Sequence, residues 1–189
     1  MNIKKIVDFI FELGQLKKIP HQGWYMIGVD NPETVGVHNI RAAQIGYFLA
    51  KLENYKNPYE VVTLIVFHDI EECRIGDFHK VAYRYIKVSG EEVVDDQIND
   101  LDKFKELKDF WVSVKKRSTI AGNIAKDAEI LEQAFTAKEL LEKGYQQAQD
   151  WINNVEKRLQ TKSAKDLFTQ LKKSSSNDWW QGLKKIPKK

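Results

Sequence analysis

The stretch "NPYEVVTLIVFHDIEECRIG", residues 57–76, decides the fold class and locates the chemistry. It has Pro58 near its start and Gly76 near its end, an arrangement typical of a helix. We therefore expect one helix over residues 57–76. The apolar run inside it ends in His68-Asp69 instead of an ordinary cap or turn. This pair is the first indication of a functional site.

The rest of the chain also favours helices. Four prolines and ten glycines punctuate 189 residues, and alternating β-branched runs are scarce, so we predict an all-α helical bundle. An amphipathic helix is expected from Ile3 to a stop at Gly14, followed by an irregular connector over residues 17–33. Further helices are predicted at 34–53, 90–117, 118–144, 145–159 and 163–173, with a short terminal helix within 174–186. That last helix carries Trp179 and Trp180, which we expect to dock on the core.

The amino-acid composition limits the classes of protein to which this chain can belong. Hydrophobic residues make up 42% and charged residues 30%, as in a globular protein, and no apolar stretch approaches the roughly 20 residues of a membrane helix. We expect one domain over residues 1–189, with a core at about 1–145, C-terminal helices at 146–183 and a basic tail at 184–189. The single cysteine fits a reducing cytoplasm. The net charge of +3 lies largely in the tail, which favours a solvated tail over a nucleic-acid arm. We predict a small-molecule partner, with neither nucleic acid nor membrane.

The His-Asp pair suggests a metal centre. His68, Asp69, Glu72 and Asp77 fall within ten positions. Imidazole and carboxylate ligands together suit a divalent ion such as manganese, cobalt, iron, nickel or zinc, with magnesium a further candidate. Adjacent helical residues point about 100° apart, so other helices must supply further ligands. His38, a lone histidine among apolar neighbours, is one candidate.

Two acids in "KDAEILE", residues 126–132, compete to be the last ligand. Asp127 shares its helix face with apolar residues and so points toward the core, whereas Glu129 shares a more polar face. Taken singly, each candidate also has an ordinary structural explanation. His38 could be a satisfied core histidine, and Arg41 or Lys126 could pair with a carboxylate.

Further motifs lie on both sides of the His-Asp pair. "LKKIPHQGW" and "DNPETVGVH" are followed by "HDIEECRIGD" and then by the Lys126 segment, in order over about the first 140 residues. This string resembles the HD-domain metal-dependent phosphohydrolases, in particular the 5'-deoxyribonucleotidase branch that includes the HD-domain-containing protein 2 group. The resemblance implies a single HD domain and hydrolysis of deoxyribonucleoside 5'-monophosphates to deoxyribonucleoside and phosphate. It also implies a homodimer, because dimers are common among relatives.

The resemblance assigns roles to individual residues. It implies metal ligation by His38, His68 and Asp69, catalysis by Glu72 and Asp77, and a place near the sugar for Trp24. Glu71 is expected to be a solvated neighbour. Two positions depart from the family pattern. His21 replaces a substrate-binding arginine, and Glu129 stands where the family has its final metal aspartate. The alignment thus favours Glu129 as the last ligand, while the helix face favours Asp127.

Two other functions compete with this interpretation. The same metal site could act on another phosphomonoester or on a cyclic nucleotide. In a second alternative, the chain is a helical interaction protein with a vestigial metal site, and Trp179 and Trp180 serve a subunit interface.

Overall fold

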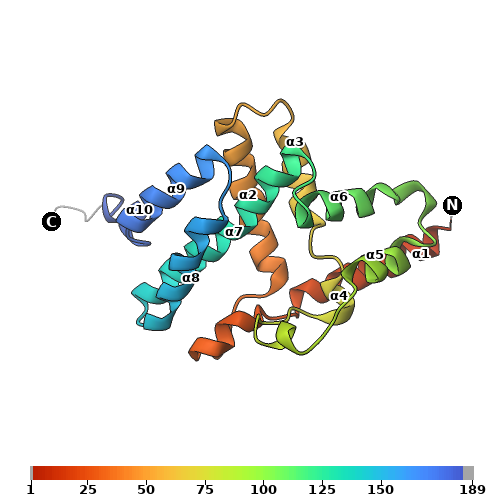
Figure 1. Cartoon of the computed structure of the whole chain (residues 1–189), viewed down its shortest axis with the longest axis horizontal. Helices are drawn as coiled ribbons and strands as arrows, with labels where there is room; N and C mark the ends of the chain where they lie inside the picture. The colour runs from red at the N-terminus through yellow and green to blue at the C-terminus, as the bar shows by residue number, and fades with distance from the viewer. Residues whose placement is uncertain (1, 185–189) are drawn as a thin grey trace.

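The computed structural model describes residues 2–184 and confirms the all-α prediction (Figure 1). Within this range the one β feature is an isolated bridge between Pro20 and Thr34. The helices are α1 (Ile3–Leu13), α2 (Val35–Leu52), α3 (Pro58–Val66), α4 (Glu72–Ile75), α5 (Gly90–Ile98), α6 (Glu106–Lys115), α7 (Ile120–Glu142), α8 (Gln149–Val155), α9 (Lys162–Lys173) and α10 (Asp178–Gln181). Short 3₁₀ turns join several of them, including one at Gln22–Ile27 within the predicted connector.

Helix α7 is the central element of the bundle. It packs against α2, α3, α6, α8 and α9, and Figure 1 shows it running through the middle of the fold. Alanines at 121, 125, 128, 134 and 137 are fully buried, and their small side chains allow neighbouring helices on several sides. Helices α6 and α7 approach each other closely at Gly122, where an added Cβ would lie 2.1 Å from the Ser113 carbonyl oxygen of α6. Helices α6 and α7 therefore cross with no room for a side chain at this point.

The predicted single helix over residues 57–76 is wrong. Helix α3 ends at Val66, and α4 begins only at Glu72. Between them the backbone makes tighter i to i+3 hydrogen bonds, from His68 N–H to Ile65 C=O at 3.3 Å and from Glu72 N–H to Asp69 C=O at 3.1 Å. The imidazole Nδ1 of His68 also lies 2.6 Å from the Ile65 carbonyl oxygen, which helps to end the helix. The His-Asp pair thus lies in a turn between two helices.

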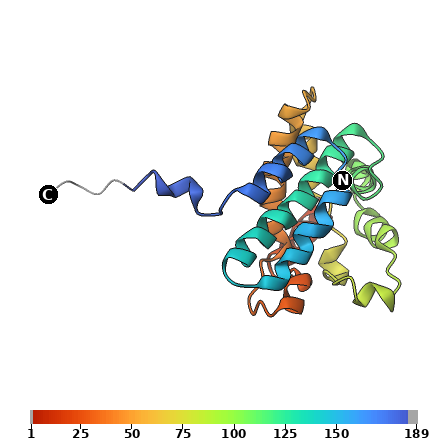
Figure 2. The same cartoon turned by 60° about the vertical axis from the view of Figure 1, so that its left-hand side comes forward.

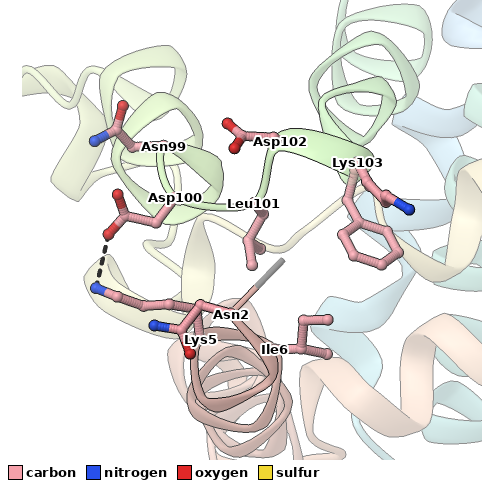
Figure 3. Close-up of a pocket in the computed structure, with 9 residues that line it drawn as sticks. Asn2, Lys5, Ile6, Asn99, Asp100, Leu101, Asp102 and Lys103 are labelled. Carbon is pink, nitrogen blue, oxygen red and sulfur yellow. Dashed lines mark ion pairs between the residues drawn. The ribbon is translucent and has the colours of Figure 1, made fainter.

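The predicted helix over residues 90–117 is also divided. Helices α5 and α6 are separated at residues 99–105, where Leu101 turns inward and packs with Phe9 in a second, smaller core. A pocket of about 360 Å³ lies between the first turn of α1 and this connection (Figure 3). The ion pair of Lys5 and Asp100, 2.7 Å long, lies at its edge. The pocket shares no residue with the His-Asp turn.

The C-terminal segment differs from the sequence prediction. We expected Trp179 and Trp180 to dock on the core, but Trp179 is 75% exposed and α10 projects from the bundle (Figure 2). Its attachment is polar, since the Glu142 carboxylate at the end of α7 accepts hydrogen bonds from Ser175 and Ser176. Most of the predicted basic tail, residues 185–189, lies outside the described residues. Among the helices of residues 2–184, none combines the length and apolarity needed to cross a bilayer.

Candidate metal centre

Two helices and one turn bring four predicted ligands together. His38 lies in α2, His68 and Asp69 lie in the turn after α3, and Glu129 lies in α7. One ligand atom from each of His38, His68 and Asp69 falls within 4.8 Å of the others, and all three residues are buried. His68 Nε2 is 3.0 Å from Asp69 Oδ2 and 3.8 Å from Glu129 Oε2. His38, His68 and Asp69 thus form one buried group, and Glu129 reaches this group at His68.

His68 has the chemistry of a metal ligand. Its Nδ1 bonds the Ile65 carbonyl oxygen, which can only accept, so Nδ1 carries the proton and Nε2 carries a lone pair. Burial lowers the pKa of His68, which favours this neutral form. Nε2 has no hydrogen-bond partner among the described residues, although it is buried. A buried lone pair without a partner costs free energy, and a bound cation would satisfy it.

His38 is oriented by a carboxylate from α7. Its Nδ1 bonds Glu132, and Glu132 in turn accepts from Arg41 Nε at 2.8 Å and from Thr136 at 3.0 Å. Burial alone would lower the pKa of His38, but the Glu132 carboxylate outweighs it and raises this pKa to about 9. A carboxylate on the far nitrogen of a histidine fixes the ring and directs Nε2 toward a metal. Sequence reasoning did not identify Glu132, although it named Arg41 as a structural partner for a carboxylate.

Glu129 lies beside His68. Its carboxylate receives an ion pair from Lys126 one helical turn earlier, at 2.5 Å. Burial would raise the pKa of Glu129, but the ammonium group of Lys126 outweighs it and lowers this pKa to about 2, so the group is an anion. The more polar helix face predicted for Glu129 is nevertheless buried at this residue, which is only 8% exposed.

Asp127 is also buried, but its carboxylate serves another part of the fold. It accepts hydrogen bonds from the backbone N–H groups of Gln160 and Thr161, at 3.0 and 2.7 Å, and from the Thr161 hydroxyl. Arg117 adds an ion pair at 2.9 Å. These bonds hold the start of α9 against α7. The core-facing position predicted for Asp127 is confirmed, and its described contacts are with this helix start and with Arg117.

The acids after the His-Asp pair lie in different environments. Glu72 has a buried Oε2 without a partner among the described residues, and burial together with nearby Asp69 raises its pKa well above the usual range. Asp77 accepts a hydrogen bond of 2.7 Å from the backbone N–H of Gln22. The expectation that Glu71 is solvated is wrong, since it is 5% exposed and its Oε1 lies 2.8 Å from Lys115 Nζ.

The two residues predicted to bind substrate lie on the segment held by Asp77. The His21 ring is 4.5 Å from the His38 ring, centroid to centroid, so this side chain borders the metal ligands. Its Nδ1 lies 3.6 Å from Glu33. Trp24 is nearly fully buried and packs on Trp151 at 5.0 Å between ring centroids. It also lines a cavity of about 390 Å³ that Glu33 and residues of α7 complete.

Comparisons with known proteins identify the family of the chain. A family model described as "HD domain" matches residues 13–172. The protein 5'-deoxynucleotidase HDDC2 of Bos taurus is 29% identical over 141 residues, which cover 72% of this chain and 68% of that protein. The Xenopus laevis protein of the same name is 27% identical over 159 residues, covering 80% and 78%.

Solved structures give the same picture of the fold. The crystal structure of "genomics APC5600" superposes with a TM-score of 0.81 at 30% identity, covering 94% of this chain and 99% of that one. A predicted coding region, AF1432, from Archaeoglobus fulgidus has a TM-score of 0.66 at 26% identity, with 94% and 99% covered.

Proposed function

This chain belongs to the HD domain family, and from this premise we propose that it is a metal-dependent phosphohydrolase acting on deoxyribonucleoside 5'-monophosphates. The observation that carries the proposal is the buried His38, His68, Asp69 and Glu129 cluster, with the unpartnered Nε2 of His68 inside it. The substrate is suggested by the relatives named 5'-deoxynucleotidase. Asp127 is left out of the proposed ligand set because its carboxylate is engaged with Arg117 and the start of α9.

The donor set favours a transition metal. His38 and His68 would bind through Nε2, because both Nδ1 atoms are engaged elsewhere. Two imidazoles with two carboxylates suit manganese, iron, cobalt, nickel or zinc better than magnesium, which prefers an all-oxygen shell. When bound, such an ion would supply positive charge for the phosphate and lower the pKa of a water molecule.

Other residues of the chain would handle protons and hold the substrate. Glu72, with its free Oε2, is the proposed acid or base at the reacting phosphate. Asp77 would act through the Gln22 backbone, fixing the segment that carries His21 and Trp24. His21 would meet the phosphate with a shorter side chain than the arginine of the family pattern, so we propose weaker phosphate binding.

Substrate selectivity is the direct test of this function. With manganese or cobalt added, the purified protein is expected to release phosphate from deoxyribonucleoside monophosphates about tenfold faster than from ribonucleotides, or about 1.4 kcal/mol in activation free energy. A malachite-green assay over both series measures this, with a cyclic nucleotide and a simple phosphomonoester as competing substrates. Equal, metal-independent release from all of them would contradict the proposal. A protein that binds no metal would favour the vestigial alternative.

Glu132 offers a second test that probes metal binding alone. Because Glu132 orients His38, Glu132→Gln is expected to weaken Mn²⁺ affinity about 10- to 100-fold, as is typical when a carboxylate that bonds a metal-ligating histidine is replaced. Isothermal titration measures the affinity. Glu139→Gln is the matched control, since Glu139 also pairs with Arg41 but does not contact His38. Equal affinities for the two variants would argue against His38 as a ligand.

We also propose a single-domain homodimer in the cytoplasm. The support for a dimer is an exposed apolar face along α2, formed by Val37, Ile40, Phe48 and Leu52. The cytoplasmic location remains a prediction from the single cysteine. Light scattering on the purified protein measures the mass of the assembly.

A further inference from the structure

The two carboxylate oxygens of Asp69 have different partners. Oδ2 lies 3.0 Å from His68 Nε2 and so faces the proposed metal position. Oδ1 lies 3.0 Å from Lys115 Nζ, which reaches in from the last residue of α6. A carboxylate with one oxygen toward each of two cations has the arrangement of a bridging ligand. The second cation here is an ammonium group.

The surroundings of this ammonium resemble a metal site. Ligand oxygens of Asp69, Glu71 and Glu72 lie within 4.8 Å of one another. Lys115 Nζ is 2.8 Å from Glu71 Oε1, while Glu71 Oε2 and Glu72 Oε2 are buried and unpartnered among residues 2–184. Three clustered carboxylates are the oxygen-rich donor set that hard divalent cations prefer. Without a cation, their mutual repulsion and desolvation would be costly.

We propose that Lys115 occupies a second cation position of this centre, so that the protein carries one metal ion and one fixed ammonium charge. The carboxylate cluster of Asp69, Glu71 and Glu72 would bind a second divalent ion once the lysine is removed. This inference rests on the proposed function only in assuming that the first position binds a metal. A two-metal centre places positive charge on both the attacking and the leaving oxygen of a phosphoryl transfer. Here the ammonium of Lys115 supplies one of these two charges.

Lysine is suited to this position. Its ammonium is a compact point charge with three donors, so it can bond two carboxylates at once. Lys115 Nζ lies 3.0 Å from Asp69 Oδ1 and 2.8 Å from Glu71 Oε1, so two carboxylates surround its charge. A permanent charge needs no ion from solution. We therefore expect the wild-type protein to bind a single ion per chain even at high metal concentration.

The test is the number of ions bound per chain. Isothermal titration with Mn²⁺, checked by elemental analysis after gel filtration, is expected to give one ion for the wild type and two for Lys115→Ala. Lys115→Arg, which keeps a cation, is the control and should bind one. Two ions on the wild type, or one ion on Lys115→Ala, would overturn the inference. No ion on either protein would overturn the proposed function as well.

Two further measurements guard against a folding defect. If Lys115→Ala is unfolded without metal, circular dichroism should show that Mn²⁺ restores its helices at two ions per chain. The double variant Glu71→Gln with Lys115→Met removes both buried charges, so it is expected to fold and to bind one ion. Binding of two ions by this double variant would show that Glu71 is not a ligand of the second position and would overturn the inference.

Discussion

Replacing Asp69 by alanine is expected to abolish metal binding and to lower the rate of phosphate release by about 10³-fold or more, because the metal supplies most of the activation of water. Asp69 is the carboxylate next to His68 Nε2, and it also bonds Lys115. The variant therefore removes the acidic ligand shared by both cation positions. Steady-state phosphate release with Mn²⁺, together with titration of the metal, measures both effects.

The control for this variant is a surface aspartate. Asp95 lies on α5, is exposed, and pairs with Lys108 without belonging to the ligand group, so Asp95→Ala should keep its activity and its metal. Pairs of this exposed kind contribute little to stability. If Asp69→Ala retained full activity, the proposed metal centre would have to be abandoned.

The second large effect concerns stability. Asp127→Ala is expected to lower the free energy of unfolding by about 3–5 kcal/mol, the cost of breaking a buried ion pair from one side. The change leaves Arg117 and the backbone N–H groups of Gln160 and Thr161 without their acceptor. Urea unfolding followed by circular dichroism measures the difference. Metal binding should remain.

Glu129→Gln is the matched variant on the same helix. It lies two residues from Asp127, yet it is expected to lose metal while changing stability much less, since its partner Lys126 can reach solvent. The two variants together decide which acid of "KDAEILE" completes the centre. Loss of metal in Asp127→Ala, with retention in Glu129→Gln, would reverse the proposed assignment.

The sequence predicted much of the fold because local signals agree with it. Gly14 ends α1, Thr119 caps α7, and Gly144, with a φ of 105°, follows its end. The interruption at residues 67–71 had no such signal, since no proline or glycine occurs there. It depends instead on the hydrogen bond of the His68 imidazole to the Ile65 carbonyl. A side chain serving the site thus overrides the helical propensity of its neighbours.

On α7, hydrophobic periodicity could not show which buried carboxylate lies beside the histidines, and the reason is different. A helix packed on several sides has no single inner face, so Asp127, Glu129 and Glu132 are all buried although they point in different directions. Hydrophobic patterning distinguishes core from solvent and does not distinguish one buried neighbour from another.

The residues that support the centre were the hardest to foresee. Glu132 reaches His38 across 94 positions of sequence, and Lys115 reaches Asp69 across 46. Neither belongs to the motif string, and a lysine or glutamate on a charged helix ordinarily indicates a solvated face. Lys115 reaches Asp69 from the end of α6, two residues beyond Ser113, where α6 crosses α7.

The crossing of α6 and α7 restricts which residue can occupy position 122. Since a Cβ at position 122 would meet the Ser113 carbonyl oxygen, even one methyl group there must push α6 outward and carry Lys115 with it. Gly122 makes no contact with any proposed ligand, yet a drift to alanine would be selected against through the lysine it displaces. The position of Lys115 at the proposed centre therefore depends on residue 122 remaining a glycine.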